Sequence, residues 1–247
     1  MAVTDVTLNY SLTSDKGLAG HFDPLPGLYI AGTSEGLFNV DNTALPFGRV
    51  ITYKGSTAGG VGLPSATNQT VAGFSFYQAS YERNAQFNGV AGTPYQYCAE
   101  VIRKGALLYI VPEENLAVTD TLYFRCILNA TLGTYEALGR IRNDADNITI
   151  SNVALTSNVA TITAVGHGLT VGQVVTIADL TTTALNGTHT VASTPTSDTF
   201  TFAKTNANIN STSDSGTIAR CAVLSNVRLI EAATAGQVAK LAIDLPY

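Results

Sequence analysis

The sequence predicts a protein built almost entirely of β-strands. Thr, Val, Ile and Tyr, which favour strands, are frequent, whereas Glu, Lys and Arg, which helix-rich proteins use heavily, are scarce. Charged residues make up 13% of the 247 residues, and a typical soluble domain has about 25%. Because 45% of the residues are hydrophobic, disorder is excluded as the overall state.

Charge and cysteine usage exclude several classes of protein. The net charge of −5 argues against a nucleic-acid-binding protein, which would carry a basic face. The first residues lack the basic and apolar regions of a secretory signal, and no apolar run is long enough to cross a membrane. Three cysteines cannot all pair within one chain, so we expect buried free thiols at Cys98, Cys126 and Cys221.

The first part of the chain reads as strands separated by turns. We expect an extended segment over residues 23–32, a turn and strand over 44–55, and a loop over 55–68. Another strand follows from Val71 and alternates apolar and polar residues. Its two predicted faces are Ala72, Phe74 and Phe76 on one side and Gly73, Ser75 and Tyr77 on the other.

The middle and the end of this β-rich pattern contain two further features. Residues 95–114 read as a β-hairpin that turns at Lys104-Gly105, and one strand is expected in each of 115–128 and 134–141. The last segment, 224–245, holds the one mild helix signal, over Ile230–Ala235 and ending at Gly236, before a closing strand. These expectations leave the all-β class unchanged.

Composition changes sharply inside the chain. Residues 148–219 contain 18 Thr but only four charged side chains, Asp179, Asp198, Lys204 and Asp214. All 11 Tyr lie outside this segment. No Pro- or Gly-rich linker flanks it, so we predict a module inserted into a surface loop of a host domain made of residues 1–147 and 220–247.

The predicted insert reads as a small barrel of five or six short strands. Residues 159–165 alternate apolar and polar, 166–172 form a turn, and further strands start near Val174 and Thr199. Asn186-Gly187 is a strong signal for a two-residue hairpin turn.

No group of residues predicts catalysis or a cofactor. The three histidines, His21, His167 and His189, are far apart in sequence and show no metal-ligand spacing. The glycine-rich stretch 55–62 lacks the Lys-Ser/Thr ending of a phosphate loop. Acidic residues at Glu113-Glu114 and in 143–147 could bind a cation, but a solvated turn is the preferred interpretation of 143–147 because it lacks the Gly and distant Glu of a calcium loop. We therefore expect no catalytic residues, no metal and no cofactor.

Aromatic and apolar residues are the better candidates for function. Tyr side chains on a polar-leaning strand face are common in protein interfaces, although burial in a core is the usual role of such residues. The candidate interface residues are Phe22, Leu28, Tyr29, Phe47, Tyr77, Tyr81 and Tyr95.

The insert resembles a known type of module. The motifs are HGL at 167–169, Gly172, VTI at 175–177, LNGTHTV at 185–191 and TFTF at 199–202. This order is similar to modules inserted in structural proteins of tailed phages. It also looks like the small β-barrel half-domain of ubiquitin-activating enzymes, in shape only, because the segment has no Cys nucleophile.

The host part resembles the structural cement proteins of phage capsids. The motifs are LPFGRVITYKG from Leu45, VAGFSFYQ from Val71, YCAEVIRKGALLYIV from Tyr97, AVTDTLYFR from Ala117, ALGRIRNDA from Ala137 and AATAGQVAKLAIDL from Ala232. The match departs from the family where the insert interrupts it after Ala145.

This resemblance implies a barrel- or sandwich-like cement domain and a structural role rather than an enzymatic one. Such a protein would decorate the outer capsid surface of the virion, bind the major capsid protein and form a homotrimer that bridges neighbouring capsid subunits. An extended N-terminal arm, residues 1–30, would wrap a neighbour or the capsid. A tail or fibre adhesin that binds host surface glycans is the alternative; no nucleic-acid or membrane partner is expected.

Overall fold

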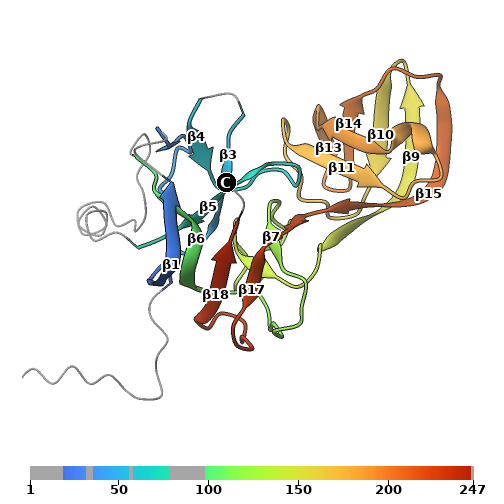
Figure 1. Cartoon of the computed structure of the whole chain (residues 1–247). Helices are drawn as coiled ribbons and strands as arrows, with labels where there is room; N and C mark the ends of the chain where they lie inside the picture. The colour runs from blue at the N-terminus through green and yellow to red at the C-terminus, as the bar shows by residue number, and fades with distance from the viewer. Residues whose placement is uncertain (1–18, 32–35, 56–57, 78–97, 246–247) are drawn as a thin grey trace, which may run out of the picture.

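The computed structural model describes residues 19–31, 36–55, 58–77 and 98–245 and confirms the all-β prediction. Three sheets contain all the regular strands, and the one helical element in the described ranges is a 3-10 turn at Thr183–Leu185. Within those ranges no helix is long and apolar enough to span a membrane. Figure 1 shows two lobes, which we call the first lobe (described residues up to 146 and from 220) and the second lobe (147–219).

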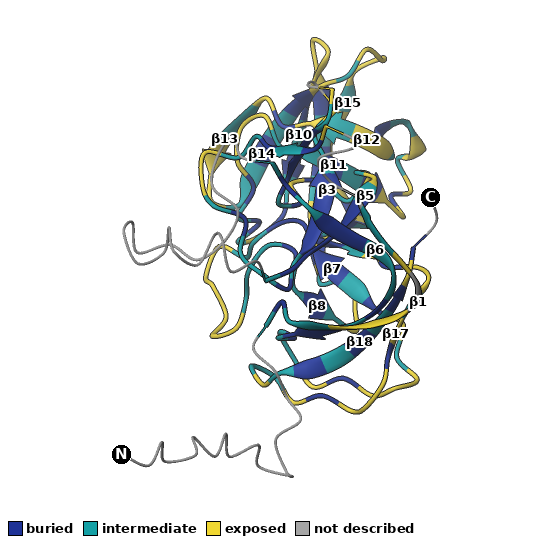
Figure 2. Ribbon diagram, turned by 60° about the vertical axis from the view of Figure 1, so that its left-hand side comes forward, coloured by how far each residue is buried: buried dark blue, intermediate teal, exposed yellow. Residues whose placement is uncertain are grey.

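An eight-stranded sheet forms most of the first lobe, in the order β17-β18-β6-β5-β3-β4-β2, with β1 paired to β6. Buried residues concentrate on β3, β5 and β6, which are largely dark blue in Figure 2. The strands are β1 (Phe22–Ala31), β2 (Phe38–Asn39), β3 (Val50–Tyr53), β4 (Gly60–Gly62), β5 (Val71–Ser75), β6 (Val101–Ile110), β17 (Val227–Leu229) and β18 (Ala239–Asp244).

The predicted hairpin at Lys104-Gly105 is wrong, because β6 runs without interruption through both residues. Gly105 has a φ of 70°, a conformation that glycine also adopts in turns. Here it forms an irregularity in the pairing with β1: residues 25–28 of β1 lie between the pairs Pro24–Ala106 and Tyr29–Lys104. A glycine in the left-handed region can therefore bend a strand instead of ending it.

Part of the predicted N-terminal arm is a strand of this lobe. Residues 22–31 form β1, which pairs antiparallel with β6 of the same chain, and only residues 1–18 of the arm lie outside the described residues. Gly20 secures the start of β1: its N–H donates to the carbonyl of Tyr109 (2.7 Å), and its carbonyl accepts from the N–H of Tyr77 (2.7 Å).

Strand β5 corrects the predicted face assignment. Phe74 and Phe76 belong to the large core cluster as expected. Ala72 instead belongs to a second cluster, because Thr52 pairs with Val71 while Ile51 pairs with Gly73, which leaves Ala72 as a bulge. One extra residue in a strand reverses the side-chain direction beyond it.

Three other expectations for the first lobe need correction. The predicted loop 55–68 contains β4, and the strand expected over 134–141 shrinks to β8 (Ile141–Arg142) after a series of turns. The helix signal at Ile230–Ala235 is also wrong: Ala233 makes a β-bridge with Leu116, so tertiary pairing overrides a weak local preference. Strand β8 completes a three-stranded sheet with β7 (Tyr123–Arg125) and β16 (Cys221–Val223).

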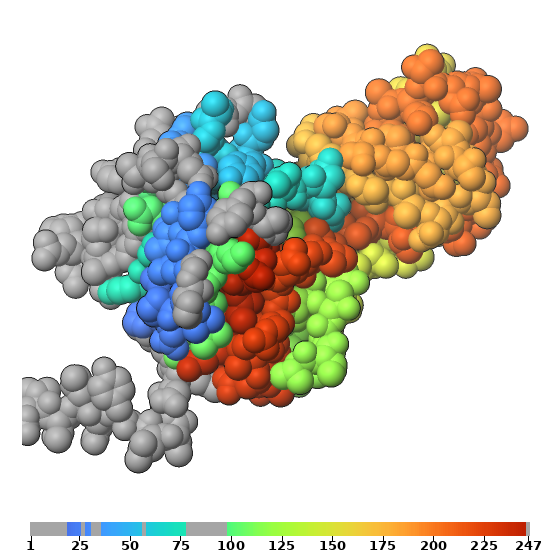
Figure 3. Space-filling model, viewed as in Figure 1, coloured from blue at the N-terminus to red at the C-terminus, as the bar shows by residue number. Residues whose placement is uncertain are grey.

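The second lobe is a single seven-stranded sheet in the order β12-β11-β15-β9-β10-β14-β13. Its strands all come from residues 147–219, and Figure 3 shows the lobe as a separate mass on one side of the first. The strands are β9 (Asn147–Thr156), β10 (Val159–Thr163), β11 (Val174–Ala178), β12 (Gly187–Thr190), β13 (Ser193–Thr196), β14 (Thr199–Ala203) and β15 (Ile209–Ala219).

This sheet curls around an apolar interior. Phe200 and Phe202 of β14 are fully buried, and the His189 ring of β12 stacks on Phe202 with ring centroids 3.9 Å apart. The predicted two-residue turn at Asn186-Gly187 is wrong, since Asn186 has a φ of −67° and its side chain bonds both the N–H and the carbonyl of Leu180 (3.1 Å each). The Asn instead holds closed the longer connection between β11 and β12.

The tight turn lies between β9 and β10. Ser157 and Asn158 have φ values of 50° and 65°, the positive pair that characterises the type I′ turn of two-residue hairpins. The strands on either side pair in perfect register, from Thr156 with Val159 to Asn152 with Thr163. The two-residue hairpin turn of the second lobe is therefore formed by Ser157 and Asn158.

We predict that Ser157→Val destabilises the protein by about 1–3 kcal/mol, because a β-branched side chain resists the left-handed conformation. The matched control is Thr156→Val, which changes the preceding residue at the exposed end of β9 and is expected to be nearly neutral. Urea unfolding of both variants measures the difference. Equal midpoints for the two would contradict the type I′ assignment.

Candidate functional site

Most of the predicted interface residues are partly buried in the described part of the chain. Phe22, Tyr29, Phe47 and Tyr77 are half-buried, and Leu28 is 37% exposed. Tyr81 and Tyr95 lie outside the described residues. Their role in contacting a partner therefore stays a prediction.

Three of these aromatic side chains, those of Phe22, Phe47 and Tyr77, cluster near the start of β1. The Phe22 ring packs edge-on against Phe76 (5.3 Å between centroids), and the Tyr77 ring lies 4.7 Å from His21 and 5.5 Å from Phe47. Edge and tilted contacts of this kind stabilise aromatic pairs beyond their burial. This cluster fixes the point at which the N-terminal segment joins the fold.

The two segments that connect the lobes lie side by side. The N–H groups of Arg220 and Cys221 both donate to the carbonyl of Ala145 (3.1 Å), and the N–H of Cys126, the residue after β7, donates to the carbonyl of Arg220 (2.9 Å). Asn147 and Ala219 are then the first paired residues of β9 and β15. The lobes are joined by a hydrogen-bonded junction rather than by separate linkers.

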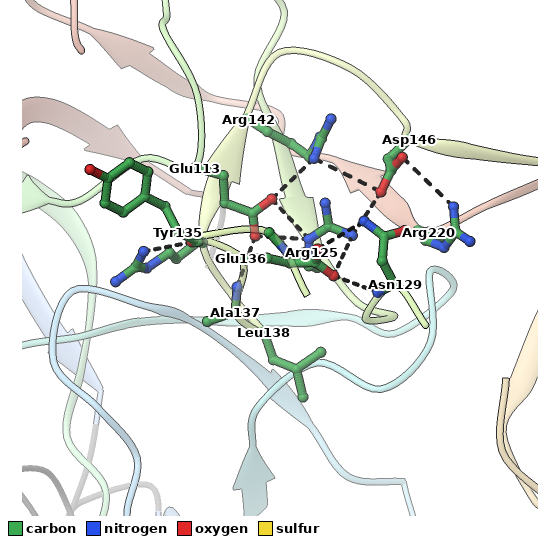
Figure 4. Close-up of polar contacts among 12 residues, drawn as sticks. Glu113, Arg125, Asn129, Tyr135, Glu136, Ala137, Leu138, Arg142, Asp146 and Arg220 are labelled. Carbon is green, nitrogen blue, oxygen red and sulfur yellow. Dashed lines mark hydrogen bonds and ion pairs between the residues drawn. The ribbon is translucent and has the colours of Figure 1, made fainter. Parts of the chain in front are cut away.

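A buried arginine lies at the centre of this junction. The Arg125 side chain is 1% exposed, and its Nε lies 2.8 Å from both carboxylate oxygens of Glu113. Its Nη1 donates to Asp146 (2.8 Å) and to the carbonyl of Ile127 (3.0 Å), and lies 3.3 Å from Glu136 (Figure 4). A charge removed from water in this way must be paired, because unpaired burial costs several kcal/mol.

Two further arginines extend the network to both connecting segments. Arg142 lies 3.1 Å from Glu113 and 2.6 Å from Asp144, and Arg220 lies 3.7 Å from Asp146. The acidic turn 143–147 is therefore not simply solvated as expected: Asp146 and Asp144 are bound by arginines. Within the described ranges, no group of three His, Cys, Asp or Glu side chains is arranged to hold a metal ion.

The network also sets the pKa values of its carboxylates. Partial burial opposes ionisation of Asp146, but the hydrogen bond and charge of Arg125 prevail and hold its pKa below the usual range. For Glu136, burial is likewise outweighed by hydrogen bonds from the backbone of Asn129 and Gly133, which lower its pKa. An acid whose pKa is lowered by folding stabilises the fold above its unfolded pKa and loses this effect as the pH falls.

The HGL motif supplies a second contact between the lobes. Gly166 and Gly168 have φ values of 59° and 65°, and the Nδ1 of buried His167 accepts from the N–H of Leu169 (2.9 Å). A Cβ at Gly168 would lie 2.7 Å from the backbone nitrogen of Ala130 in the first lobe. The motif is therefore a turn that packs against the neighbouring lobe, and glycine is required for the close approach.

The remaining reactive side chains have structural environments. His21 contacts Tyr77, whereas His167 and His189 pack against Phe200 and Phe202 of the second lobe. The three cysteines are free thiols as predicted, with Cys126 and Cys221 buried and Cys98 only partly so. Burial raises the pKa of the Cys126 thiol to about 12 and that of Cys221 as well. Thiols protonated at neutral pH are poor nucleophiles.

Sequence reasoning missed Arg125, Glu136 and Arg220 as members of one site. The signal that could have found Arg125 is its position between Phe124 and Cys126 in a strand that is otherwise apolar, because a buried charge needs partners. Nothing local in the sequence indicates that Glu113 and Asp146 are those partners.

Replacing Arg125 by Met is predicted to destabilise the protein by about 3–5 kcal/mol, because it leaves the buried Glu113 carboxylate without its main partner. The matched control is Lys104→Met, which removes an exposed ion pair with Asp244 (3.3 Å) and is expected to cost at most about 1 kcal/mol. Denaturant unfolding at pH 7 compares the two.

The same pair tests the pH dependence. The difference in unfolding free energy between the parent protein and Arg125→Met should shrink as the pH falls. Glu113, whose pKa burial raises above its usual range, takes up a proton first, and Asp146 and Glu136, whose pKa values are lowered, follow at lower pH. A difference that stays constant from pH 7 to pH 3 would show that Arg125 acts through packing alone.

Comparison with known proteins identifies the family of this chain. The family model described as structural cement protein (E217 gp24/Pam3 gp6) matches residues 6–178. No curated protein and no solved structure matches the chain, so the likeness to the half-domain of ubiquitin-activating enzymes stays a prediction. The matched range covers well over half of the 247 residues, including β1 to β11. This chain belongs to the phage structural cement protein family, a structural and non-enzymatic family of the virion capsid.

Proposed function

We propose that this protein binds the outer surface of the phage capsid and stabilises it by bridging neighbouring major capsid subunits, acting as a homotrimer. The observation that carries the proposal is the cement family match over residues 6–178. Family membership supplies the association with the capsid; the bridging role, the outer position and the trimer are our inference.

The stabilising mechanism is linkage. A protein that binds only the assembled shell shifts the equilibrium toward that shell by an amount that grows with its occupancy. Several attachment points in one oligomer raise the effective affinity without new types of contact. A cement protein therefore needs a rigid body with surfaces suited to burial against protein.

The low charge of this chain supports such a role. Charged residues are depleted at the centres of protein interfaces because their desolvation is costly, and here they are 13% of the sequence. Much of the charge in the first lobe is paired at the junction around Arg125 and Arg142, where it is not available to a partner.

We further propose that residues 148–219 form an inserted domain that projects from the capsid as a knob. All three of its carboxylates accept internal hydrogen bonds: Asp179 from the hydroxyl of Thr217 (3.1 Å), Asp198 from the N–H of Gly166 (2.8 Å), and Asp214 from the N–H groups of Thr181 and Thr182 (3.0 and 2.8 Å). The remaining outer surface is hydroxyl-rich and nearly uncharged, which suits weak contacts between neighbouring copies or a spacer.

Purified protein is expected to bind capsids that lack it and to raise their disruption temperature. Deleting residues 1–18 should abolish binding while leaving a folded protein, because Gly20 and its bonds to Tyr109 and Tyr77 remain. Co-sedimentation with expanded capsids measures binding, and circular dichroism checks the fold. A truncated protein that binds as well as the full chain would overturn the role of the arm.

The alternative function, a tail or fibre adhesin, predicts the opposite result in the binding experiment. Free protein that binds host cells or their surface glycans, with no affinity for capsids, would contradict the cement proposal. A copy number per virion close to that of the major capsid protein supports cement, whereas a few dozen copies would indicate a tail component.

Replacing residues 148–219 by an Asn-Gly link is expected to leave a folded first lobe. The flanking segments are already held together through Arg220, Cys221 and Ala145, so a short turn suffices. Some loss of stability is expected because the buried residues of both lobes form one continuous cluster. Cooperative thermal unfolding of the shortened protein is the measurement, and an unfolded product would show that 148–219 is not a separable module.

A further inference from the structure

Two segments from distant parts of the first lobe form a closed arch. We use this name for residues 116–122 and 224–233. At one end Leu116 and Ala233 exchange backbone hydrogen bonds (2.9 and 2.8 Å), and at the other the N–H of Leu224 donates to the carbonyl of Leu122 (2.8 Å). Figure 3 shows the two segments side by side, in lime green and red, along the lower edge of the first lobe.

Polar contacts hold the arch in one conformation. The Asp120 carboxylate accepts from the N–H of Ala117 (2.8 Å) and from the side-chain amide of Asn143 (3.2 Å). Just outside the arch, the side chain of Asn115 accepts from the N–H of Ala235 (3.0 Å). A surface that is ordered before binding loses little conformational entropy when a partner covers it.

The arch places apolar side chains in water. Val118 and Ile230 of the arch are 53% and 38% exposed, and Val223, the residue just before its second segment, is 55% exposed, whereas Leu122 and Leu224 are buried in the core. Leu122 and Leu224 supply the apolar contacts with the core, whereas Val118 and Ile230 are exposed and do not pack in the core. Apolar side chains exposed on an ordered loop surface are available for burial against a protein partner.

We propose that this arch is a surface through which the protein contacts the phage capsid, in addition to the N-terminal segment, an inference that rests on the proposed function. The capsid is the partner that family membership supplies. In Figure 1 the arch lies at the lower end of the first lobe, whereas the second lobe extends from its upper right. A capsid bound at the arch leaves the second lobe pointing away from the shell, as the proposed knob requires.

The test is the double variant Val118→Ser with Ile230→Ser in the full-length protein, measured for binding to capsids that lack the cement protein. We expect binding to weaken about tenfold or more, as for removal of central apolar contacts in an interface. The matched control, Val165→Ser with Val171→Ser, changes side chains that are 76% and 64% exposed on the second lobe and should bind as the parent does. Thermal unfolding shows whether each variant is folded.

Amide hydrogen exchange of the unmodified protein gives an independent readout. Exchange in residues 112–122 and 224–236 should slow on capsids, while exchange in the exposed turns of the second lobe should not. Normal capsid binding by the arch variant would overturn the inference and leave the cement function intact. A variant that changes oligomeric mass but not capsid binding would assign the arch to contacts between copies and also overturn it. Failure of the parent protein to bind capsids would overturn the proposed function itself.

Discussion

The burial of one positive charge constrains the rest of this structure. Arg125 is nearly inaccessible to water, and a guanidinium in that position is tolerated only if carboxylates surround it. Glu113, Glu136 and Asp146 meet this requirement from three separate segments of the chain. Each of these segments must therefore reach the same point, and the fold is built so that they do. Because Asp146 lies on the connection to the second lobe, the requirement also fixes where that lobe begins.

This arrangement has consequences for a capsid protein. The connecting segments bond to each other and to β7, and the HGL turn packs on Ala130 through Gly168, so the second lobe is held in place at several points. Under the proposed function, a lobe fixed in this way is held at a constant orientation relative to the first lobe. The second lobe carries only four charged side chains, Asp179, Asp198, Lys204 and Asp214.

The aromatic cluster and the arch of the first lobe use apolar side chains in two different ways. Phe22 and Tyr77 are apolar because they anchor the start of β1 against the sheet. Val118 and Ile230 are exposed on hydrogen-bonded loops and have no such task. Sequence reasoning favoured the aromatic residues, since aromatic side chains are common in interfaces, yet the same side chains are also the best core formers. Only their burial separates the two uses.

The sequence by itself determined the fold class and the family, because strand propensity and ordered short motifs are local properties. It also showed that residues 148–219 differ in composition from the rest, and these residues supply the whole second sheet. Tertiary structure decided what depends on distant partners: whether Gly105 ends a strand or bends it, whether 230–235 pairs with Leu116 or forms a helix, and which carboxylates surround Arg125. Pairing across more than a hundred residues of sequence carries more free energy than a weak local preference, so the local pattern gives way.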